Sequence, residues 1–379
     1  MSTNPESSKP ARIPCPTVDS ERPAADIKGR LASFGATFAS RLLGTVQPHQ
    51  HFGMPSPLVF APHENSRRYG ATHFGVMIPD LPAPHSFMAF ASLLGMTGMK
   101  ITDAANIVSM DGPRHTAVLV HGTAAATNRA LTAYSMKRDM TFAPDGSLVR
   151  FGEDAELSGR YPRFRLKTSR PGFDVDLNLS ATGEWTWFVH SRLYQHIALL
   201  ARYEGVVSWQ GNSMPVSGLA SWEYYRTISP YLLRNAPLPP RFRIPLDFFT
   251  YQIINLDSDT QLLLAYVTFM GRPAARLAHL RRAGRGATQI DGKISFTVLT
   301  VQDTPAVAPD ASVMFLPRTF RWTITDRNGK QLFEINATVD TEMLYGLAAG
   351  YVGGYRWEGS YNGKPESGRG YIEYIDQRG

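Results

Sequence analysis

The sequence predicts an all-β protein in which two antiparallel β-barrels or sandwiches lie side by side. Glycine and proline are abundant, with 32 and 27 residues, together about 16% of the chain where ~12% is usual. Short apolar runs separated by turn residues follow one another from residue 70 onward. No stretch of the length that joins parallel strands by a helix separates them, so a doubly wound parallel sheet is not expected. The length of 379 residues suits two domains.

The first 46 residues differ from the rest of the chain. Residues 1–25 are rich in Ser, Pro and charge, which predicts a disordered tail without the apolar segment of a secretory signal peptide. Residues 26–46 are expected to form an amphipathic helix, which could lie on a membrane; docking on the body of the protein is favoured, because the apolar stripe is narrow and few cations flank it. The stripe consists of Ile27, Leu31, Phe34, Phe38, Leu42 and Leu43.

A first β domain is predicted over residues 47–235. Its clearest strand is 173–180, where Phe173, Val175 and Leu177 alternate with polar residues, as in a half-buried antiparallel strand. Further strands are expected at 71–79, 86–94, 115–121, 148–153, 161–167, 184–190, 197–209 and 213–219.

A proline-rich segment separates this region from a second strand series. Residues 226–246 contain five prolines, which central strands exclude, so we place the domain boundary there. The second domain is predicted over 236–379, and Asn328-Gly329 is a strong hairpin turn within it. Its strands are expected at 247–256, 261–269, 293–301, 318–325, 331–338 and 370–375.

Charge and motifs narrow the function classes. The net charge of +7 arises from 31 Arg and 8 Lys, which permits an anionic partner without requiring one. The single cysteine, Cys15, excludes an intramolecular disulfide framework. The phosphate-binding loop, the dinucleotide-binding glycine motif, the serine-hydrolase elbow and the common zinc motifs are absent. We expect a soluble, cytoplasmic protein; the arginine-rich usage suggests a bacterial source.

One segment of the chain is strongly basic. Residues 272–285 carry five arginines and are either an anion-binding patch or a solvated loop between two strands. The loop is favoured, because no aromatic side chains are interleaved for stacking on nucleic-acid bases. We therefore expect no nucleic-acid partner, while transient contact with a membrane surface and the oligomeric state stay open.

The ten histidines could hold a metal or contact a ligand. No acidic residue follows the pairs His49–His51 and His190–His196 at ligand spacing, so a metal site is not expected. His73, His115 and His121 lie on predicted strands, where an inward imidazole could touch a ligand, although such a residue is more often part of the core or rim.

Two clusters place a carboxylate beside aromatic residues, at 221–225 (SWEYY) and 355–359 (YRWEG). The structural interpretation is that the aromatics fill a barrel while the glutamate pairs with an arginine. The functional interpretation is an acid in an apolar pocket, since burial raises a carboxyl pKa and keeps the group ready to donate a proton. The residues alone favour the structural interpretation.

The order of these clusters resembles that in the AttH and carotenoid 1,2-hydratase (hydroxyneurosporene synthase) family. HIALLARYEGVVSWQGNSMPVSGLASWEYY is similar to the end of the first lipocalin-like domain of that family. LDFFTYQIINLDSDTQLLLAYV resembles the start of its second domain, and YRWEGSYNGKPESGRGYIEYID resembles its closing segment. The three segments occur in the family's order between about residues 160 and 376.

The resemblance implies two lipocalin-like β domains, a hydrophobic pocket at or near their interface and no organic cofactor or metal. Members of the AttH and carotenoid 1,2-hydratase family act on hydrophobic isoprenoid- or polyketide-like molecules, and fungal Diels–Alderases are related to that family. Glu223 falls on the family's acidic position, while Trp222 is shifted by one and Tyr224 and Tyr225 replace a His and a Glu. Trp357 and Glu358 match without a shift.

We therefore predict a cofactor-independent enzyme acting on a small, hydrophobic, unsaturated substrate by hydration, cyclisation or isomerisation. Glu223 is the predicted proton donor. The predicted pocket residues are Trp222, Tyr224, Tyr225, Trp357 and Glu358, with His73 and His115 as weaker candidates. The alternatives are a non-catalytic carrier or sensor of a lipid-like ligand and, less favoured, an interaction module.

Overall fold

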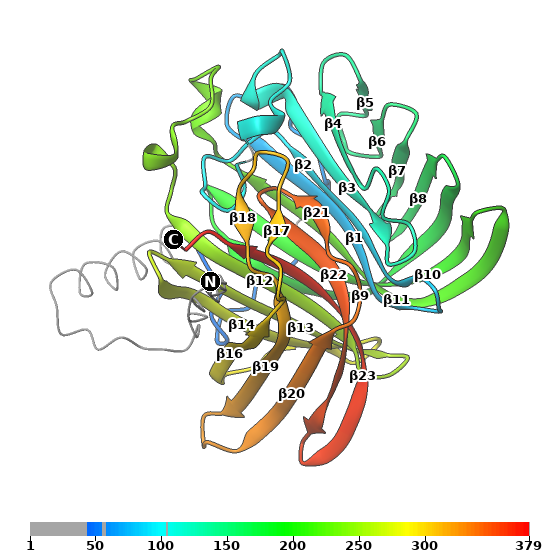
Figure 1. Cartoon of the computed structure of the whole chain (residues 1–379), viewed down its shortest axis with the longest axis vertical. Helices are drawn as coiled ribbons and strands as arrows, with labels where there is room; N and C mark the ends of the chain where they lie inside the picture. Colours follow the sequence, from blue (N-terminus) through cyan, green and yellow to red (C-terminus); the bar gives the residue numbers. More distant parts are fainter. Residues whose placement is uncertain (1–43, 55–57, 104, 379) are drawn as a thin grey trace, which may run out of the picture.

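Two large antiparallel sheets make up most of the protein in the computed structural model (Figure 1), which describes residues 44–54, 58–103 and 105–378. The first sheet has eleven strands in the order β4-β3-β2-β1-β11-β10-β9-β8-β7-β6-β5 and curls into a nearly closed barrel. Its strands are β1 (Ala71–Leu81), β2 (Ser86–Leu94), β3 (Thr116–Thr123), β4 (Leu131–Ser135), β5 (Met140–Phe142), β6 (Leu148–Phe151), β7 (Ala155–Arg160), β8 (Arg163–Arg170), β9 (Phe173–His190), β10 (Tyr194–Trp209) and β11 (Asn212–Thr227).

The second sheet has ten strands and forms a half-barrel. Its main path is β15-β14-β13-β12-β23-β22-β20-β19-β16, and β21 pairs with β22. Its strands are β12 (Leu246–Asn255), β13 (Thr260–Phe269), β14 (Arg272–Arg282), β15 (Gly286–Gln289), β16 (Gly292–Val301), β19 (Pro317–Asp326), β20 (Gln331–Val339), β21 (Leu344–Leu347), β22 (Gly350–Tyr361) and β23 (Lys364–Asp376). β17 (Ala306–Val307) and β18 (Val313–Met314) form a separate two-stranded sheet.

Helical structure among the described residues is limited to four single-turn 3-10 helices, η1 (Ala105–Ile107), η2 (Pro113–His115), η3 (Pro230–Leu232) and η4 (Pro240–Phe242). None of the helices in this part of the chain has the length and apolar character needed to cross a membrane. The all-β prediction is thus confirmed. The predicted tail 1–25 lies outside the described residues, as does the predicted helix 26–46 apart from its last three residues.

Most predicted strands are present, and the predicted bounds of several agree closely with the structure; strand 86–94, for example, is β2. One prediction is wrong: 272–285 is not a solvated loop. Residues 272–282 form β14, because Leu277, His279 and Arg281 alternate with their neighbours and face the first sheet, and Arg281 is fully buried. The five arginines concealed this alternation. The last strand of the first sheet ends at Thr227, and the first strand of the second sheet begins at Leu246. The domain boundaries themselves stay a prediction.

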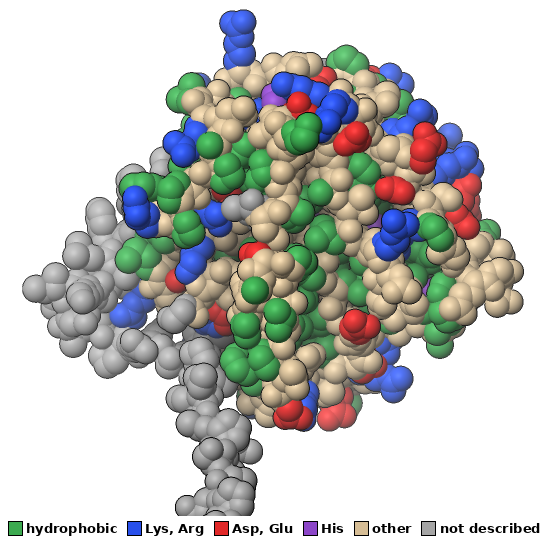
Figure 2. Space-filling view, turned by 45° about the horizontal axis from the view of Figure 1, so that its top comes forward, with side chains coloured by type: hydrophobic (Ala, Val, Ile, Leu, Met, Phe, Trp, Pro, Cys, Tyr) green, Lys and Arg blue, Asp and Glu red, His purple; other side chains and the backbone are tan. Residues whose placement is uncertain are grey.

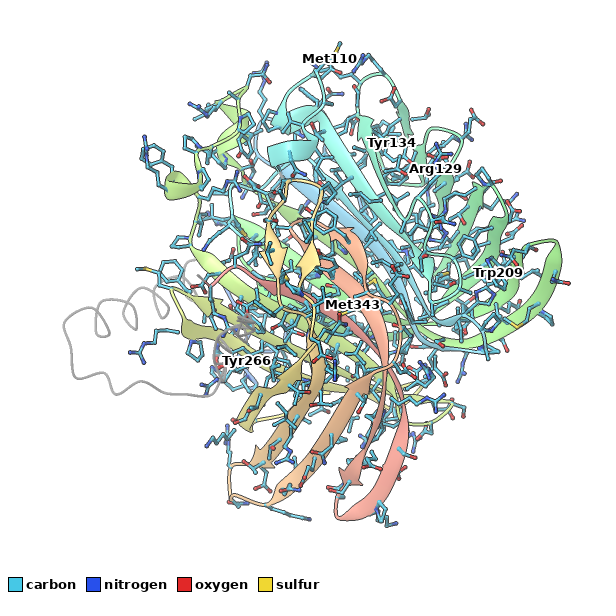
Figure 3. All side chains as sticks on the ribbon, viewed as in Figure 1. Met110, Arg129, Tyr134, Trp209, Tyr266 and Met343 are labelled. Atoms are coloured by element: carbon cyan, nitrogen blue, oxygen red, sulfur yellow. The ribbon has the colours of Figure 1, made fainter. Side chains whose placement is uncertain are left out.

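Each sheet has its own apolar interior (Figure 3). Tyr134 lies in the cluster enclosed by the first sheet, with Trp222 and Tyr224, and Tyr266 lies in the cluster of the second sheet. The two sheets also pack against each other, with β1, β9 and β11 of the first next to β12, β14 and β23 of the second. Strands in the middle of this contact are therefore buried on both faces, which places side chains of both sheets in one buried layer.

Candidate functional site

A cavity of about 150 Å³ lies in the layer between the two sheets. Its walls are mostly apolar and include Leu93, Phe188, Phe249, Leu277, Leu347 and Ile375. Polar side chains also line it, among them the imidazole, carboxyl and phenol groups of His73, His196, Glu223, Tyr225, Tyr251 and Glu373. An apolar cavity with a few convergent polar groups is the arrangement typical of a small-molecule site.

Alternation along β11 explains why Glu223 reaches this cavity. Successive side chains of a strand point to opposite faces, so Ser221, Glu223 and Tyr225 face the second sheet, whereas Trp222 and Tyr224 point into the first barrel. The register places the small residues Gly75 and Ala198 on either side of Glu223. Gly75 cannot be replaced without cost, because a Cβ there would lie 2.7 Å from the imidazole Nε2 of His73.

The carboxylate of Glu223 is buried and accepts three hydrogen bonds. The Ser221 hydroxyl donates to Oε1 at 2.8 Å, the Tyr251 hydroxyl also donates to Oε1, and the imidazole Nε2 of His196 lies 3.3 Å from Oε2. Burial by itself would raise the pKa of Glu223. The hydrogen bond and charge of His196, the charge of His73 and the hydrogen bond from Tyr251 outweigh burial and lower this pKa.

This environment revises the predicted role of Glu223. A carboxyl whose pKa is held below its ordinary value is ionised near neutral pH and has no proton to give. The geometry therefore fits a proton acceptor better than the proton donor expected from the sequence. Glu223 lines the cavity; its catalytic role stays a prediction.

A second carboxyl, Glu373, lines the same cavity in the opposite electrostatic state. It is buried on β23 beside Tyr251 of β12, and its Oε1 accepts a 3.0 Å hydrogen bond from the Tyr371 hydroxyl. Burial raises the pKa of Glu373 well above its ordinary value, the negative charge of Glu223 raises it further, and the bond from Tyr371 offsets this only in part. The surroundings of the two carboxyls thus shift their pKa values in opposite directions.

Sequence reasoning missed this second carboxyl as a site residue. Glu373 lies in the closing segment that resembles the AttH family, YRWEGSYNGKPESGRGYIEYID, but the sequence analysis singles out only Trp357 and Glu358 there. The signal that could have identified it is the run Gly370–Tyr374, in which Tyr371 and Glu373 share one face of a strand. The face of β23 that carries Tyr371 and Glu373 becomes a cavity wall because the first sheet packs over it. The sequence does not reveal which face of a strand another sheet will cover.

A fully buried arginine, Arg281, contacts the Glu223 cluster through Ser221. One terminal nitrogen of Arg281 donates to Ser221 Oγ at 3.2 Å and to the side-chain oxygen of Gln261. Its Nε and other terminal nitrogen have no hydrogen-bond partner among the described residues. Burial lowers the pKa of Arg281 to about 10, which the charges of Tyr251 and Glu223 counteract. Arg281 therefore remains a cation and holds Ser221, one of the donors to Glu223.

The aromatic and imidazole groups complete the cavity. The Nδ1–H of His73 donates to the Ser92 carbonyl at 2.7 Å, so Nε2 carries its lone pair, and burial lowers the His73 pKa to about 4. The His73 ring stacks on Tyr225 at 5.2 Å between centroids. The hydroxyl of Tyr225 is buried without a partner among the described residues, so a ligand could receive its hydrogen bond.

The structure brings together only part of the predicted site. Glu223, Tyr225 and His73 line the cavity. Trp222 and Tyr224 do not, because they face the first barrel, where Trp222 stacks on Phe164 at 4.5 Å.

The remaining predicted residues lie elsewhere. Trp357 is buried in the second sheet's core, and Glu358 on the same strand is exposed to solvent. His115 is half-buried at the end of η2. The substrate-binding roles of Trp222, Tyr224, Trp357, Glu358 and His115 therefore stay predictions without support from position.

A larger hollow of about 270 Å³ lies nearby, between β9, β14, β15 and residues 46–52, and Glu184 and His279 line it. It holds one carboxyl and no carboxyl pair, so the inter-sheet cavity is the better candidate for proton-transfer chemistry. Nowhere in the described ranges do three or more His, Cys, Asp or Glu side chains come close enough to hold a metal ion.

Comparison with known proteins adds the family and the fold. The profile of a family described as "Family of unknown function (DUF6670)" matches residues 91–379. No curated protein matches. A crystal structure of a Nitrosomonas europaea protein assigned as AttH is similar, with a TM-score of 0.56 and 16% identity over 88% of this chain and 99% of that chain. CghA in complex with Sch210972 matches at a TM-score of 0.43 and 9% identity, over 82% of this chain and 89% of that chain. The AttH-like, lipocalin-like resemblance of the sequence is thus confirmed at the level of the fold.

Proposed function

The chain belongs to the DUF6670 family, whose function is unknown, and we propose that it is an enzyme that binds a small, hydrophobic, unsaturated molecule in the inter-sheet cavity and moves protons to and from it. The observation that carries this proposal is the pair of buried carboxyls. Glu223 and Glu373 line one cavity, and their surroundings shift their pKa values in opposite directions. Two carboxyls with separated pKa values are the arrangement that divides acid and base roles between like residues.

The proposed reaction begins with a proton from Glu373. Its O–H adds a proton to one carbon of a substrate double bond and leaves a cation on the neighbouring carbon. Glu223 then accepts a proton, either from a water molecule that adds to the cation or from an adjacent C–H bond. The first course is hydration, the second isomerisation; attack by a second double bond before the proton loss is cyclisation. Exchange with solvent restores both carboxyls.

The cavity walls suit such an intermediate. Tyr225, Tyr251 and Phe188 present aromatic rings near the carboxyl pair, and an aromatic face stabilises a nearby cation by ~0.5–2 kcal/mol. The substrate class, isoprenoid- or polyketide-like, rests on the resemblance of the sequence to the AttH family. No cofactor is needed for the proposed steps. A cytoplasmic location remains a prediction.

A non-catalytic carrier of a lipid-like ligand is the second candidate, because apolar walls alone suffice to bind such a molecule. The buried carboxyl pair favours the enzyme, since a carrier has no use for a carboxyl pair whose pKa values are separated. A carrier would bind its ligand equally well with both carboxyls amidated.

The test starts with the ligand that co-purifies with the protein, identified by mass spectrometry. Incubation with this compound should convert it, and Glu373→Gln or Glu223→Gln should lower the rate by about 10²–10⁴-fold with little change in binding. Glu358→Gln, an exposed glutamate beside a buried tryptophan, is the matched control. Recovery of the compound unchanged by the wild-type protein, with equal binding by all variants, would establish the carrier.

The pH profile gives a second readout of the same proposal. Turnover requires ionised Glu223 and protonated Glu373, so it should fall in acid as Glu223 takes up a proton and fall in alkali as Glu373 loses one. The plateau lies between the lowered pKa of Glu223 and the raised pKa of Glu373. A rate that rises through the acidic range, down to the lowest pH at which the protein is folded, would assign the donor role to Glu223 instead.

A further inference from the structure

Large apolar side chains are exposed on two neighbouring segments beside the cavity. In the connection from β11 to β12, Leu233 is 98% exposed and Phe242 is 62% exposed, and Met270 at the tip of the β13–β14 hairpin is 57% exposed. Ile228 and Ile244 are each about 40% exposed. A single exposed apolar residue is ordinary, whereas a group of them beside a cavity indicates an interaction surface.

Backbone contacts connect these segments to the wall of the cavity. Ile244 forms a parallel bridge with Met99, a residue of the cavity wall, and Leu246 of the wall follows two residues later. The amide of Met270 donates to the Pro245 carbonyl at 3.1 Å. Val267 and Ala274, which flank the hairpin tip, also line the cavity. We call Ile228, Leu233, Phe242, Ile244 and Met270 the rim.

The rim is basic as well as apolar. Residues 228–245 contain three arginines and no Asp or Glu, and residues 267–276 contain two arginines and again no acid. Arg241 is exposed, and its guanidinium lies 4.8 Å from the ring centroid of Phe242. Three acidic groups act on these segments from outside: Asp103 accepts a hydrogen bond from Tyr231, Asp247 accepts hydrogen bonds from Thr268 and the Gly271 amide, and Asp310 interacts with Arg243. Figure 2 shows hydrophobic and basic side chains side by side along the left-hand edge, the side on which residues 228–245 run in Figure 1.

We propose that the rim docks on a membrane surface rich in anionic phospholipid. Apolar side chains at such a surface enter the boundary between headgroups and acyl chains, and each Arg near it adds about 1 kcal/mol of attraction. A bilayer is also where an apolar molecule of the kind that fits the cavity accumulates, and docking places the cavity wall at Met99 and Leu246 close to it. The inference requires the cavity and its rim, but not a particular reaction of Glu223 and Glu373.

Flotation of the full-length protein with vesicles tests this docking. Vesicles of phosphatidylcholine with phosphatidylserine should carry the protein, and vesicles of phosphatidylcholine alone should carry far less. Salt at 0.5 M should release the protein, since the Debye length falls to about 4 Å and exposed charges further apart than this are screened. No flotation with the anionic vesicles would overturn the proposal.

Variants locate the contact. The double change Phe242→Ser and Met270→Ser should weaken vesicle binding at least ten-fold, and Arg241→Gln should weaken it about five-fold. Val206→Ser removes an apolar side chain of 40% exposure from β10, away from the rim, and should leave binding unchanged. These residues are exposed, so folding, checked by circular dichroism, should be retained.

Other occupants of the rim would give different results. Equal loss of binding with Val206→Ser, or no loss with the rim variants, would show that another surface binds the vesicles and overturn the proposal. Vesicle binding that appears only after removal of residues 1–43 would assign the rim to the chain's own N-terminal segment. Competition by RNA at equal charge concentration without any preference for vesicles would assign it to a general polyanion surface.

Discussion

Two Trp-Glu pairs, one on β11 and one on β22, look alike in the sequence and have different surroundings in the structure. On β11, Trp222 fills the first barrel while Glu223 is 2% exposed and faces the second sheet. On β22, Trp357 is buried in the second sheet, but Glu358 is exposed to solvent. Both tryptophans are core residues; only one of the two glutamates is in a cavity.

The difference arises from how many faces of each strand are covered. Alternation sends neighbouring residues to opposite faces in both strands. The second sheet packs over β11 at Glu223, where the Tyr251 hydroxyl reaches the carboxylate. At Glu358 no such layer of described residues lies above β22, and the side chain is exposed. Whether a glutamate of this fold lies in a cavity therefore depends on packing between the sheets, and a neighbouring tryptophan in the sequence does not by itself place it there.

The largest expected effect concerns the two tryptophans. Trp222→Ala should lower the free energy of unfolding by about 3–5 kcal/mol, since Trp222 stacks on Phe164 and contacts Phe60 at 4.4 Å between centroids. Trp357→Ala should lie at the lower end of that range, because it has no ring pair among the described residues and aromatic pairs add ~0.5–1.5 kcal/mol. Chemical denaturation measures both.

The milder change Trp222→Phe separates packing from ligand binding. It should leave the affinity for the co-purifying ligand unchanged, because residue 222 faces away from the cavity. A loss of affinity as large as that of a cavity variant such as Leu277→Ala, at equal stability, would contradict the assignment of faces on β11.

A smaller effect is expected at two buried tyrosines. Tyr251→Phe removes a donor to the ionised Glu223, and a hydrogen bond to a charged group contributes about 1.5–3 kcal/mol to stability. Tyr355→Phe is the matched control, because the Tyr355 hydroxyl is fully buried without a partner among the described residues, so its loss should be neutral or stabilising. Equal destabilisation by both variants, measured by urea unfolding, would show that the bond to Glu223 contributes nothing.

How far the sequence predicts this protein depends on whether a feature is local. Alternation and turn residues place strands such as 86–94 and the hairpin at Asn328-Gly329, because each signal lies within one or two strands. Glu223 in a pocket follows from the resemblance of a contiguous segment. The sequence does not reveal the burial of Arg281 and Glu373, because both lie in the second sheet and are covered by the first sheet, more than fifty residues away along the chain. The groups that lower the pKa of Glu223, His196, His73 and Tyr251, likewise lie on three different strands.

Glu223 and Glu358 should also differ in how much each contributes to stability as the pH changes. The folded-state pKa of Glu223 is lowered, so its contribution is present above the unfolded-state pKa and is lost as the pH falls through the folded-state value. The contribution is about 1.4 kcal/mol for each unit between the two pKa values. Glu223→Gln should therefore flatten the acid limb of the stability curve, whereas Glu358→Gln should change stability by no more than about 0.5 kcal/mol at any pH, because an exposed side chain without a buried partner contributes little. Thermal unfolding from pH 3 to pH 8 measures both. If the two variants follow the same curve, the second sheet does not hold Glu223 as an anion, and the two Trp-Glu pairs are equivalent after all.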